Sequence, residues 1–179
     1  MSYRNERGFT LVEVIVVAAI IAVLAGILVP MIFKEVDESK VSKAQADTKA
    51  VMTSLLSFRK DTGRWPVLNG GNGCLAEITL LNGNGAAPAT YHASWNTAIL
   101  GTLDAQLSSN NACYGANWKG PYIPTVGVDP WGHAYVINAD SFGVAGAPVL
   151  ILSAGPDGII DTATNASAPA NDDIGVRIN

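Results

Sequence analysis

An apolar segment near the N-terminus limits the folds that are open to this chain. Residues Val14 to Phe33 include no charged side chain, and only Gly26 and Pro30 interrupt the hydrophobic residues. About twenty apolar residues in an α-helix reach across a hydrocarbon core of roughly 30 Å. A buried core helix is the alternative, but such helices seldom stay apolar on all sides over this length. The segment is therefore predicted to span a membrane.

The charges on either side of the segment predict its orientation. Arg4 and Arg7 precede the run, whereas three acidic residues follow it, Glu35, Asp37 and Glu38. Basic flanks stay in the cytoplasm, so everything after Lys34 is expected outside. The inner membrane of a bacterium is the expected location, with a single pass.

The residues before the run do not form an ordinary secretory signal. Such a signal has a shorter apolar region and a small-residue cleavage site after it. Here the small residue, Gly8, stands before the run, so cleavage after it would leave the apolar segment as the new N-terminus. Glu13 lies at the start of the same region, where a charge costs about 2.5–3.5 kcal/mol on insertion scales and is usually paired or functional. The alternative is a carboxylate that is protonated or that reaches water at the interface.

The segment Gly8–Glu13, GFTLVE, resembles the class III signal of type IV pilins and type II secretion pseudopilins. The resemblance implies cleavage between Gly8 and Phe9 by a prepilin peptidase, and N-methylation of Phe9. Cleavage creates a positive amine on Phe9, one helical turn from Glu13. In a staggered filament, Glu13 would meet the amine of a neighbouring subunit, in a medium of low dielectric that strengthens the attraction.

The helix is expected to continue beyond the membrane, from Phe9 to Asp61, over roughly 80 Å at about 1.5 Å per residue. Gly63 is a plausible C-cap, and Pro66 cannot continue the helix. The part after Lys34 is amphipathic, with an apolar stripe formed by Val36, Ala44, Val51, Met52, Leu55, Leu56 and Phe58. The first half has no core of its own to enter. It can be buried only in lipid or against other copies of itself.

Four segments follow from this division. They are a leader at 1–8, a membrane and filament-core helix at 9–33, the amphipathic half of the helix at 34–62, and a globular head at 63–179. With 18 glycines and 15% charged residues, the composition suits a loop-rich extracytoplasmic domain. The net charge of -4 argues against a nucleic-acid binder, which would normally present a basic face.

The first part of the head, 69–117, is rich in Gly, Asn, Ala and Ser and is predicted to be mostly loop. One short helix is expected near Asn96 to Leu107, where apolar residues recur every four positions. Cys74 and Cys113 bracket this insertion, and outside the cytoplasm two cysteines most simply form one disulfide. Two buried free thiols are the alternative. A metal site is not expected, because neither cysteine has a C-x-x-C neighbour.

Three strands are predicted in the second part of the head, at His133–Ile137, Pro148–Ser153 and Ile174–Ile178. The first follows Asp129–Gly132, DPWG, which has the residues of a β-turn. The fold class expected is α+β, with a small antiparallel sheet packed on the lower half of the long helix. The G-P-Y and D-P-W-G elements look like those of the major pseudopilin of type II secretion.

A calcium site is predicted near the C-terminus. Calcium takes six to eight oxygen ligands, often from a flexible loop. The segment SAGPDGIIDT, followed by NDDI, resembles the calcium loop of major pseudopilins. By that match the ligands are Asp157, Asp172 and Asp173, with Asp161 and Asn171 in reserve. The intervening ATNASAPAN departs from the family, and a solvated acidic tail with Asx-turn aspartates is the alternative.

The resemblance implies a structural subunit of a helical filament, most simply the pseudopilus that drives type II secretion. It implies further partners, namely an inner-membrane assembly platform and minor pilin-like subunits. A surface pilus subunit for adhesion, motility or DNA uptake is the alternative. Both cysteines precede the predicted sheet and the C-terminal region is acidic, which favours the pseudopilin. The filament is accordingly expected in the periplasm, or on the cell surface in the alternative.

Nothing in the chain predicts an enzyme. There is no Walker loop, no H-E-x-x-H and no nucleophile elbow, and His92 and His133 have no recognisable catalytic spacing. The four tryptophans suit core or turn packing better than a ligand-stacking surface. A membrane-anchored binding module or hydrolase is the remote alternative, and it would need neither Gly8–Phe9 processing nor Glu13.

Overall fold

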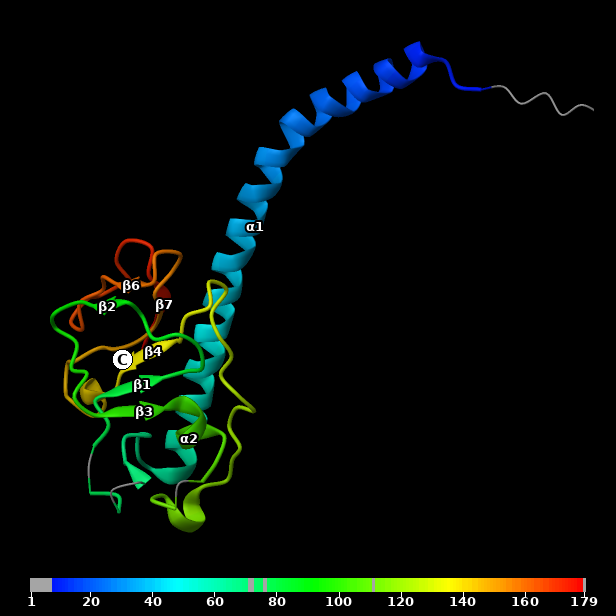
Figure 1. Ribbon diagram of the computed structural model, residues 1–179. Coiled ribbons are helices and arrows are strands. Elements are labelled where there is room, and N and C mark those ends of the chain that lie inside the picture. Colours follow the sequence, from blue (N-terminus) through cyan, green and yellow to red (C-terminus); the bar gives the residue numbers. More distant parts are fainter. Residues whose placement is uncertain (1–7, 71–72, 76, 111, 179) are drawn as a thin grey trace, which may run out of the picture. The chain divides into compact units, whose positions relative to one another are not determined.

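The computed structural model describes residues 8–70, 73–75, 77–110 and 112–178 (Figure 1). The chain divides into two compact units, Met1–Ser39 and Lys40–Asn179. Most of the expected leader, with Arg4 and Arg7, lies outside the described residues. The fold is α+β, with one long helix and a small sheet, as the sequence predicts.

One helix, α1, runs from Leu11 to Thr62 and continues through Pro30. It ends where the sequence indicates. Gly63 has a φ of +71°, and its amide donates to the carbonyl of Arg59 at 2.8 Å. A left-handed residue after the last turn is the usual way to satisfy a final carbonyl, and glycine adopts it without a steric penalty.

In the first unit, the helix has no core. Every residue from Leu11 to Phe33 is exposed, and the large apolar side chains among them expose between 49 and 74% of their surface. This stretch of the helix is long and apolar enough to cross a membrane. An apolar helix without a partner in its own chain needs lipid or another protein to cover it.

In the second unit, the end of α1 buries one stripe against the head. Its buried residues are Ala44, Thr48, Val51, Ser54, Leu55 and Phe58. Each of these positions lies three or four residues from another in the set, so they share one helix face. The stripe is narrower than predicted, because Leu56 remains 46% exposed in this unit. In the first unit, Val36 is likewise 45% exposed.

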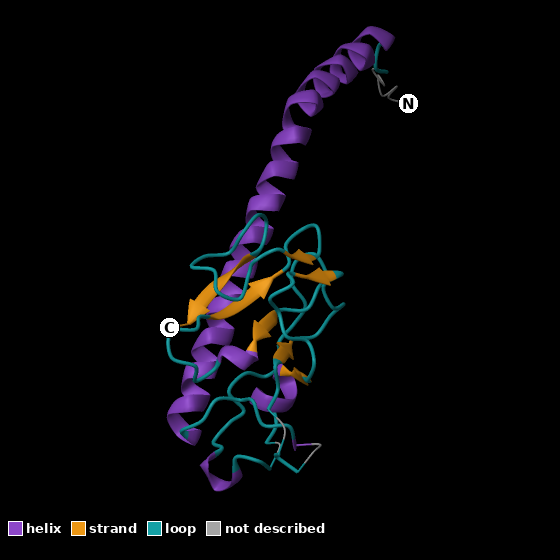
Figure 2. Cartoon of the chain, turned by 90° about the vertical axis from the view of Figure 1, so that its left-hand side faces the viewer, coloured by secondary structure: helices purple, strands orange, loops and turns teal. Residues whose placement is uncertain are grey.

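The main sheet has five strands in the order β3-β1-β4-β5-β7. Figure 2 draws the strands of the head in orange. Their bounds are β1 Leu80–Asn82, β3 Leu100–Thr102, β4 Val136–Asn138, β5 Val149–Ser153 and β7 Ile174–Ile178. Every pair is antiparallel except β1 with β3, which is parallel. A second, two-stranded sheet pairs β2, Thr90–Tyr91, in parallel with β6, Ile159–Ile160.

The head has apolar clusters on both faces of its main sheet. Ile151 of β5 belongs to the cluster that includes Leu55 and Phe58 of α1. Its neighbours in β5, Leu150 and Leu152, belong to the other cluster. Successive side chains of a strand point to opposite faces, which explains why all of β5 is buried. The sequence VLILS, apolar at four positions, suits a strand covered on both sides.

The loop-rich insertion holds more structure than predicted. The expected helix at Asn96–Leu107 is wrong in its first half, since α2 spans only Leu103–Leu107 and β3 precedes it. Thr102 caps α2 by accepting the amide of Ala105 at 3.2 Å. A Cβ on Gly101 would lie 2.4 Å from Ile78 Cδ1, so the buried Ile78 side chain would have to shift for any larger residue there.

One strand boundary in the rest of the head also differs from the prediction, and some strands were not predicted. The strand expected from His133 begins only at Val136, while His133 itself pairs with Ala86 as an isolated bridge. The strands β1 and β2 were not predicted, because two or three residues are too few to show a periodicity. The described part of the head also includes short 3-10 helices at Gly115–Asn117 and Ala139–Ser141.

Candidate functional site

The N-terminal site places Gly8 and Phe9 just before the helix. Phe9 is 88% exposed. Glu13 and Thr10 form a reciprocal cap at the start of α1: the amide and hydroxyl of Thr10 donate to Glu13 Oε2 at 2.9 and 2.7 Å, and the amide of Glu13 donates to Thr10 Oγ1 at 3.3 Å. This is a capping box, which satisfies donors at a helix start that otherwise lack partners. The T-x-x-E spacing carries this signal, which the sequence analysis did not use.

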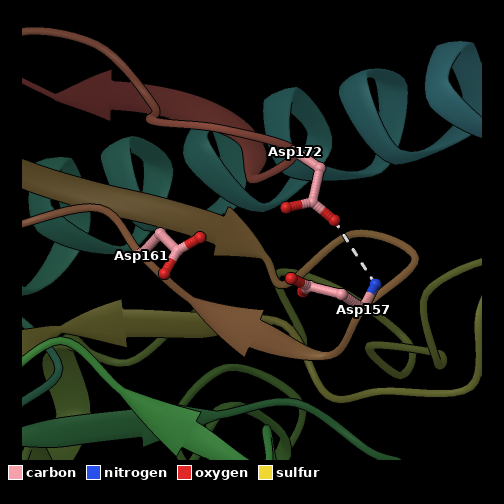
Figure 3. Close-up of side chains that lie close together, drawn as sticks. All are labelled: Asp157, Asp161 and Asp172. Carbon is pink, nitrogen blue, oxygen red and sulfur yellow. Dashed lines mark hydrogen bonds between the residues drawn. The ribbon is translucent and has the colours of Figure 1, made fainter.

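The second site is an acidic cluster in the head. Ligand oxygens of Asp157, Asp161 and Asp172 lie within 4.8 Å of one another (Figure 3). The strand β6 separates Asp157 from Asp161 in the chain, and its Ile160 is fully buried, which anchors the segment between them. The amide of Ile159 donates to Asp157 Oδ1 at 2.8 Å, so Asp157 also closes its own turn.

Asp173 binds the backbone of the segment that carries Asp161. Its Oδ2 accepts the amides of Asp161 and Thr162 at 2.9 and 2.7 Å and the hydroxyl of Thr162 at 2.5 Å. Burial raises the pKa of Asp173 above its usual range, although these bonds act to lower it. Asn171 donates its side-chain amide to Asp161 Oδ2 at 2.6 Å. Asp173 and Asn171 therefore orient Asp161. Asp161, which the sequence offered only as a reserve ligand, lies in the cluster itself.

Gly155 permits the close approach of the two acidic segments. Its φ is +64°, and a Cβ there would lie 2.3 Å from the carbonyl oxygen of Asp172 and 2.9 Å from its Oδ2. The amide of Asp157 donates to Asp172 Oδ2 at 3.3 Å across the same gap. The glycine of the S-x-G-x-D-G segment is thus needed both for its backbone conformation and for space.

The DPWG turn is linked to the acidic loop by a buried carboxylate. Asp129 accepts the amides of Trp131 and His133 on Oδ1, and the Ser153 hydroxyl on Oδ2 at 2.6 Å. The amide of Gly132 donates to the Asp129 carbonyl at 3.1 Å, which confirms the predicted turn. Ser153 in turn accepts the amide of Gly155 at 3.2 Å. This network was not predicted, because its members are far apart in the chain.

The donor set of the cluster suits a hard cation. Three carboxylates supply only oxygen ligands, which calcium prefers. Among the described residues, no lysine or arginine forms an ion pair with any of them. Asp173 Oδ1 is also buried without a hydrogen-bond partner. Buried carboxylate oxygens need a donor or a cation nearby, so the residues present fit a bound divalent ion.

The predicted disulfide is present, between Cys74 and Cys113 with their Cα atoms 5.6 Å apart. It closes the insertion that contains β1, β2, β3 and α2. The crosslink reduces the conformational freedom of this segment in the unfolded chain.

Three of the tryptophans make contacts in separate parts of the head. Trp65 stacks on Phe142 with ring centroids 4.4 Å apart, while Trp95 donates its indole N–H to the Thr162 carbonyl at 2.7 Å. Trp118 meets Tyr122 edge to face. These positions belong to packing, as the sequence analysis favoured.

Comparison with known proteins gives two matches to family models. Residues 3–29 match the prokaryotic N-terminal methylation motif, and residues 100–172 match protein G of the type II secretion system. The type II secretion system core protein G of Escherichia coli (strain K12) is 32% identical over 159 residues, covering 88% of this chain and 87% of that protein. The chain belongs to the family of type II secretion system core protein G.

Other members of the core protein G family align over a similar span. The core protein G of Pseudomonas aeruginosa is 29% identical over 158 residues, covering 88% of this chain and 89% of the relative. The type IV major pilin protein PilA of Myxococcus xanthus is 42% identical, but over only 61 residues, or 34% of this chain and 28% of that protein. No solved structure matches the chain.

Proposed function

We propose that this chain is the major structural subunit of a pseudopilus that drives type II protein secretion. The observation that carries the proposal is an apolar helix half, Leu11–Phe33, that is exposed along its whole length in a chain of the core protein G family. Such a surface has two environments available, lipid before assembly and other copies of the helix after it. The proposed role is structural and involves no catalysis by this chain.

The N-terminal site supplies the processing and assembly chemistry. A prepilin peptidase cleaves between Gly8 and Phe9, and Phe9 is then N-methylated. The new cationic amine lies next to the capping box, and Glu13 pairs with the amine of a neighbouring subunit as the helices stagger. Since the surroundings are apolar, this attraction is strong and specifies the register between copies.

The acidic cluster binds calcium. Asp157, Asp161 and Asp172 supply ligand oxygens, and Asp173 with Asn171 holds the loop that carries them. A divalent ion neutralises three carboxylates that otherwise repel one another where β7 begins. Binding then stabilises the folded head, because the unfolded chain has no assembled site.

Before assembly, the subunit resides in the inner membrane with its N-terminus in the cytoplasm and its head in the periplasm. Basic residues before the apolar helix support this orientation. Assembly then proceeds on an inner-membrane platform together with minor pilin-like subunits, and the filament grows into the periplasm.

A surface pilus subunit is the second candidate, favoured by the similarity to the PilA protein. That similarity covers about a third of the chain, whereas the core protein G relatives cover most of it. The weight of the comparison therefore lies with the pseudopilus.

Deletion of the gene distinguishes the two candidates. The pseudopilus proposal predicts that the deletion strain retains its secreted enzymes in the periplasm, and that overexpression from a plasmid restores secretion and yields filaments. A deletion strain that secretes normally but loses surface pili, adhesion or motility would favour the surface pilus instead.

A further inference from the structure

The head has a groove, lined by two arginines, that has no part in the proposed function. Its volume is about 420 Å³, and it lies between the end of α1, the loop from β4 to β5, and the edge strand β7. Arg59 comes from the last turn of α1 and Arg177 from β7, and both are exposed. Other residues that line the groove include Trp65, Val144, Gly146 and Val149.

The groove gathers positive charge without a counter-charge. No residue that lines it is acidic, and neither guanidinium forms an ion pair with a carboxylate in the described part of the chain. Two cations that share one groove repel each other unless an anion lies between them. Guanidinium groups match a carboxylate with paired N–H donors, so the groove favours that type of anion.

Arg59 is held in place before any ligand arrives. Its guanidinium carbon lies 4.3 Å from the centroid of the Trp65 ring, and Trp65 itself stacks on Phe142. A cation over an aromatic face is attracted to it, which reduces the rotamers the side chain samples. Binding by a side chain that is already ordered loses less conformational entropy.

The loop opposite adds neutral donors. Gly143 and Gly146 both have a φ of +80°, and a Cβ at either would meet nothing within 4 Å. The amides of Gly143, Ala145 and Gly146 donate to no acceptor among the described residues. Backbone N–H groups that lack an acceptor can bind an anion, and those of Gly143, Ala145 and Gly146 belong to residues that line the groove.

We propose that this groove binds an acidic side chain of a second copy of this chain, as a contact between neighbouring subunits of the filament. The inference rests on the proposed function, since a filament brings copies to a high effective concentration. The charges are complementary, because the chain has 15 acidic against 11 basic residues. Three acidic side chains are exposed and have no partner among the described residues, namely Glu35, Asp37 and Glu77. These are the candidate carboxylates.

Site-specific photo-crosslinking tests the contact in full-length protein. Val144 lines the groove and is 55% exposed, so benzoylphenylalanine in its place reports on what occupies the groove. Irradiated filaments are expected to give a crosslinked dimer, and mass spectrometry is expected to map the crosslink to a peptide that contains Glu35, Asp37 or Glu77. A crosslink only to a different protein would overturn the assignment to a second copy.

Charge variants test the energetics. Arg177→Glu is expected to lower both crosslinking and sheared filament yield at least five-fold, and Arg177→Lys less, since lysine keeps the charge but loses the paired donors. Arg64→Glu is the matched control, because Arg64 is exposed and lies outside the groove. If Arg177→Glu lowers the melting temperature of the protein in detergent, Arg177→Gln replaces it. Arg177→Gln removes the positive charge without adding a negative one, and it is also expected to lower crosslinking and filament yield.

The outcomes separate the two proposals. Normal wild-type filaments, together with unchanged yield and crosslinking in the Arg177 variants, would overturn the groove contact alone. Absence of filaments from the wild-type chain would contradict the proposed function and, with it, the inference that rests on it.

Discussion

The hydroxyl of Thr10 donates a hydrogen bond of 2.7 Å to the carboxylate of Glu13, and the amide of Glu13 returns one to the hydroxyl. This pair caps the helix on which filament assembly is proposed to depend. Glu13 therefore has a role within its own chain as well as the proposed role between chains. The two roles make different demands, because a cap needs only an acceptor oxygen, whereas pairing with an amine needs a negative charge.

Processing is expected at the Gly8–Phe9 bond. Mass spectrometry of the native protein should show loss of residues 1–8 and one methyl group on Phe9. Replacement of Gly8 by a bulky residue should leave the precursor in the membrane, because the peptidase requires a small residue there. Recovery of only full-length chain from a strain with active peptidase would contradict the assignment.

The disulfide is expected to contribute measurably to the stability of the head. In the chain-entropy model, a crosslink between residues this far apart contributes about 4 kcal/mol. Alkylation of unreduced, denatured protein should find no free thiol at Cys74 or Cys113, and reductant should lower the melting temperature. Labelling of both thiols without reductant would show that packing alone holds the insertion.

Asp129→Ala is expected to destabilise the head by about 2–4 kcal/mol, because it leaves two partly buried amides and the buried Ser153 hydroxyl without their acceptor. Urea denaturation of the soluble part from Lys40 measures this. Asp129→Asn is the matched variant and should cost less, since its amide oxygen still accepts the amides of Trp131 and His133. Equal losses for the two variants would mean that the carboxylate charge, rather than the bonds, matters.

Calcium is expected to raise the melting temperature of the head. A ligand at about 100 times its dissociation constant adds about 2.7 kcal/mol, which corresponds to roughly 5–10 °C for a domain of this size. Asp172→Ala should abolish the difference between calcium and chelator. The measurement is thermal unfolding of the soluble part from Lys40 under both conditions.

Glu77→Gln is the control for the calcium experiment, because it removes an exposed carboxylate that lies outside the cluster. It should keep the full calcium effect. Equal melting temperatures for the wild-type head in calcium and chelator, with no heat of binding by calorimetry, would favour an acidic loop without an ion.

The long helix could be predicted from the sequence because its signals are local. Twenty uncharged residues, a glycine stop and an apolar stripe each lie within a few turns of one another, and the observed ends fall within two residues of those expected. The insertion could not be predicted as well. The apolar spacing around Ile99 suggested a helix, but the backbone there pairs with Thr79, twenty residues earlier in the chain. Tertiary pairing outweighs a short periodic pattern.

The acidic site was predictable as a set and not as individual ligands. Asp157 and Asp172 lie in the cluster, as the loop resemblance suggested. Asp161 lies there too, whereas Asp173, preferred from the sequence, bonds to the amides of Asp161 and Thr162. Neighbouring carboxylates such as Asp172 and Asp173 look alike in sequence. They differ in the structure, since Asp173 is buried whereas Asp172 is partly exposed and lies in the cluster.

The most direct test of the account is the filament yield of Glu13→Gln, measured by shearing after overexpression. Glutamine preserves the acceptor that caps α1 and removes the charge, while Thr10→Ala weakens the cap by about 0.5–2 kcal/mol and preserves the charge. Pairing of Glu13 with a neighbouring amine predicts that Glu13→Gln inserts into the membrane, accumulates as monomer and forms few filaments, whereas Thr10→Ala assembles. Normal filaments from Glu13→Gln, with loss of assembly in Thr10→Ala, would contradict the pairing and leave Glu13 as a helix cap.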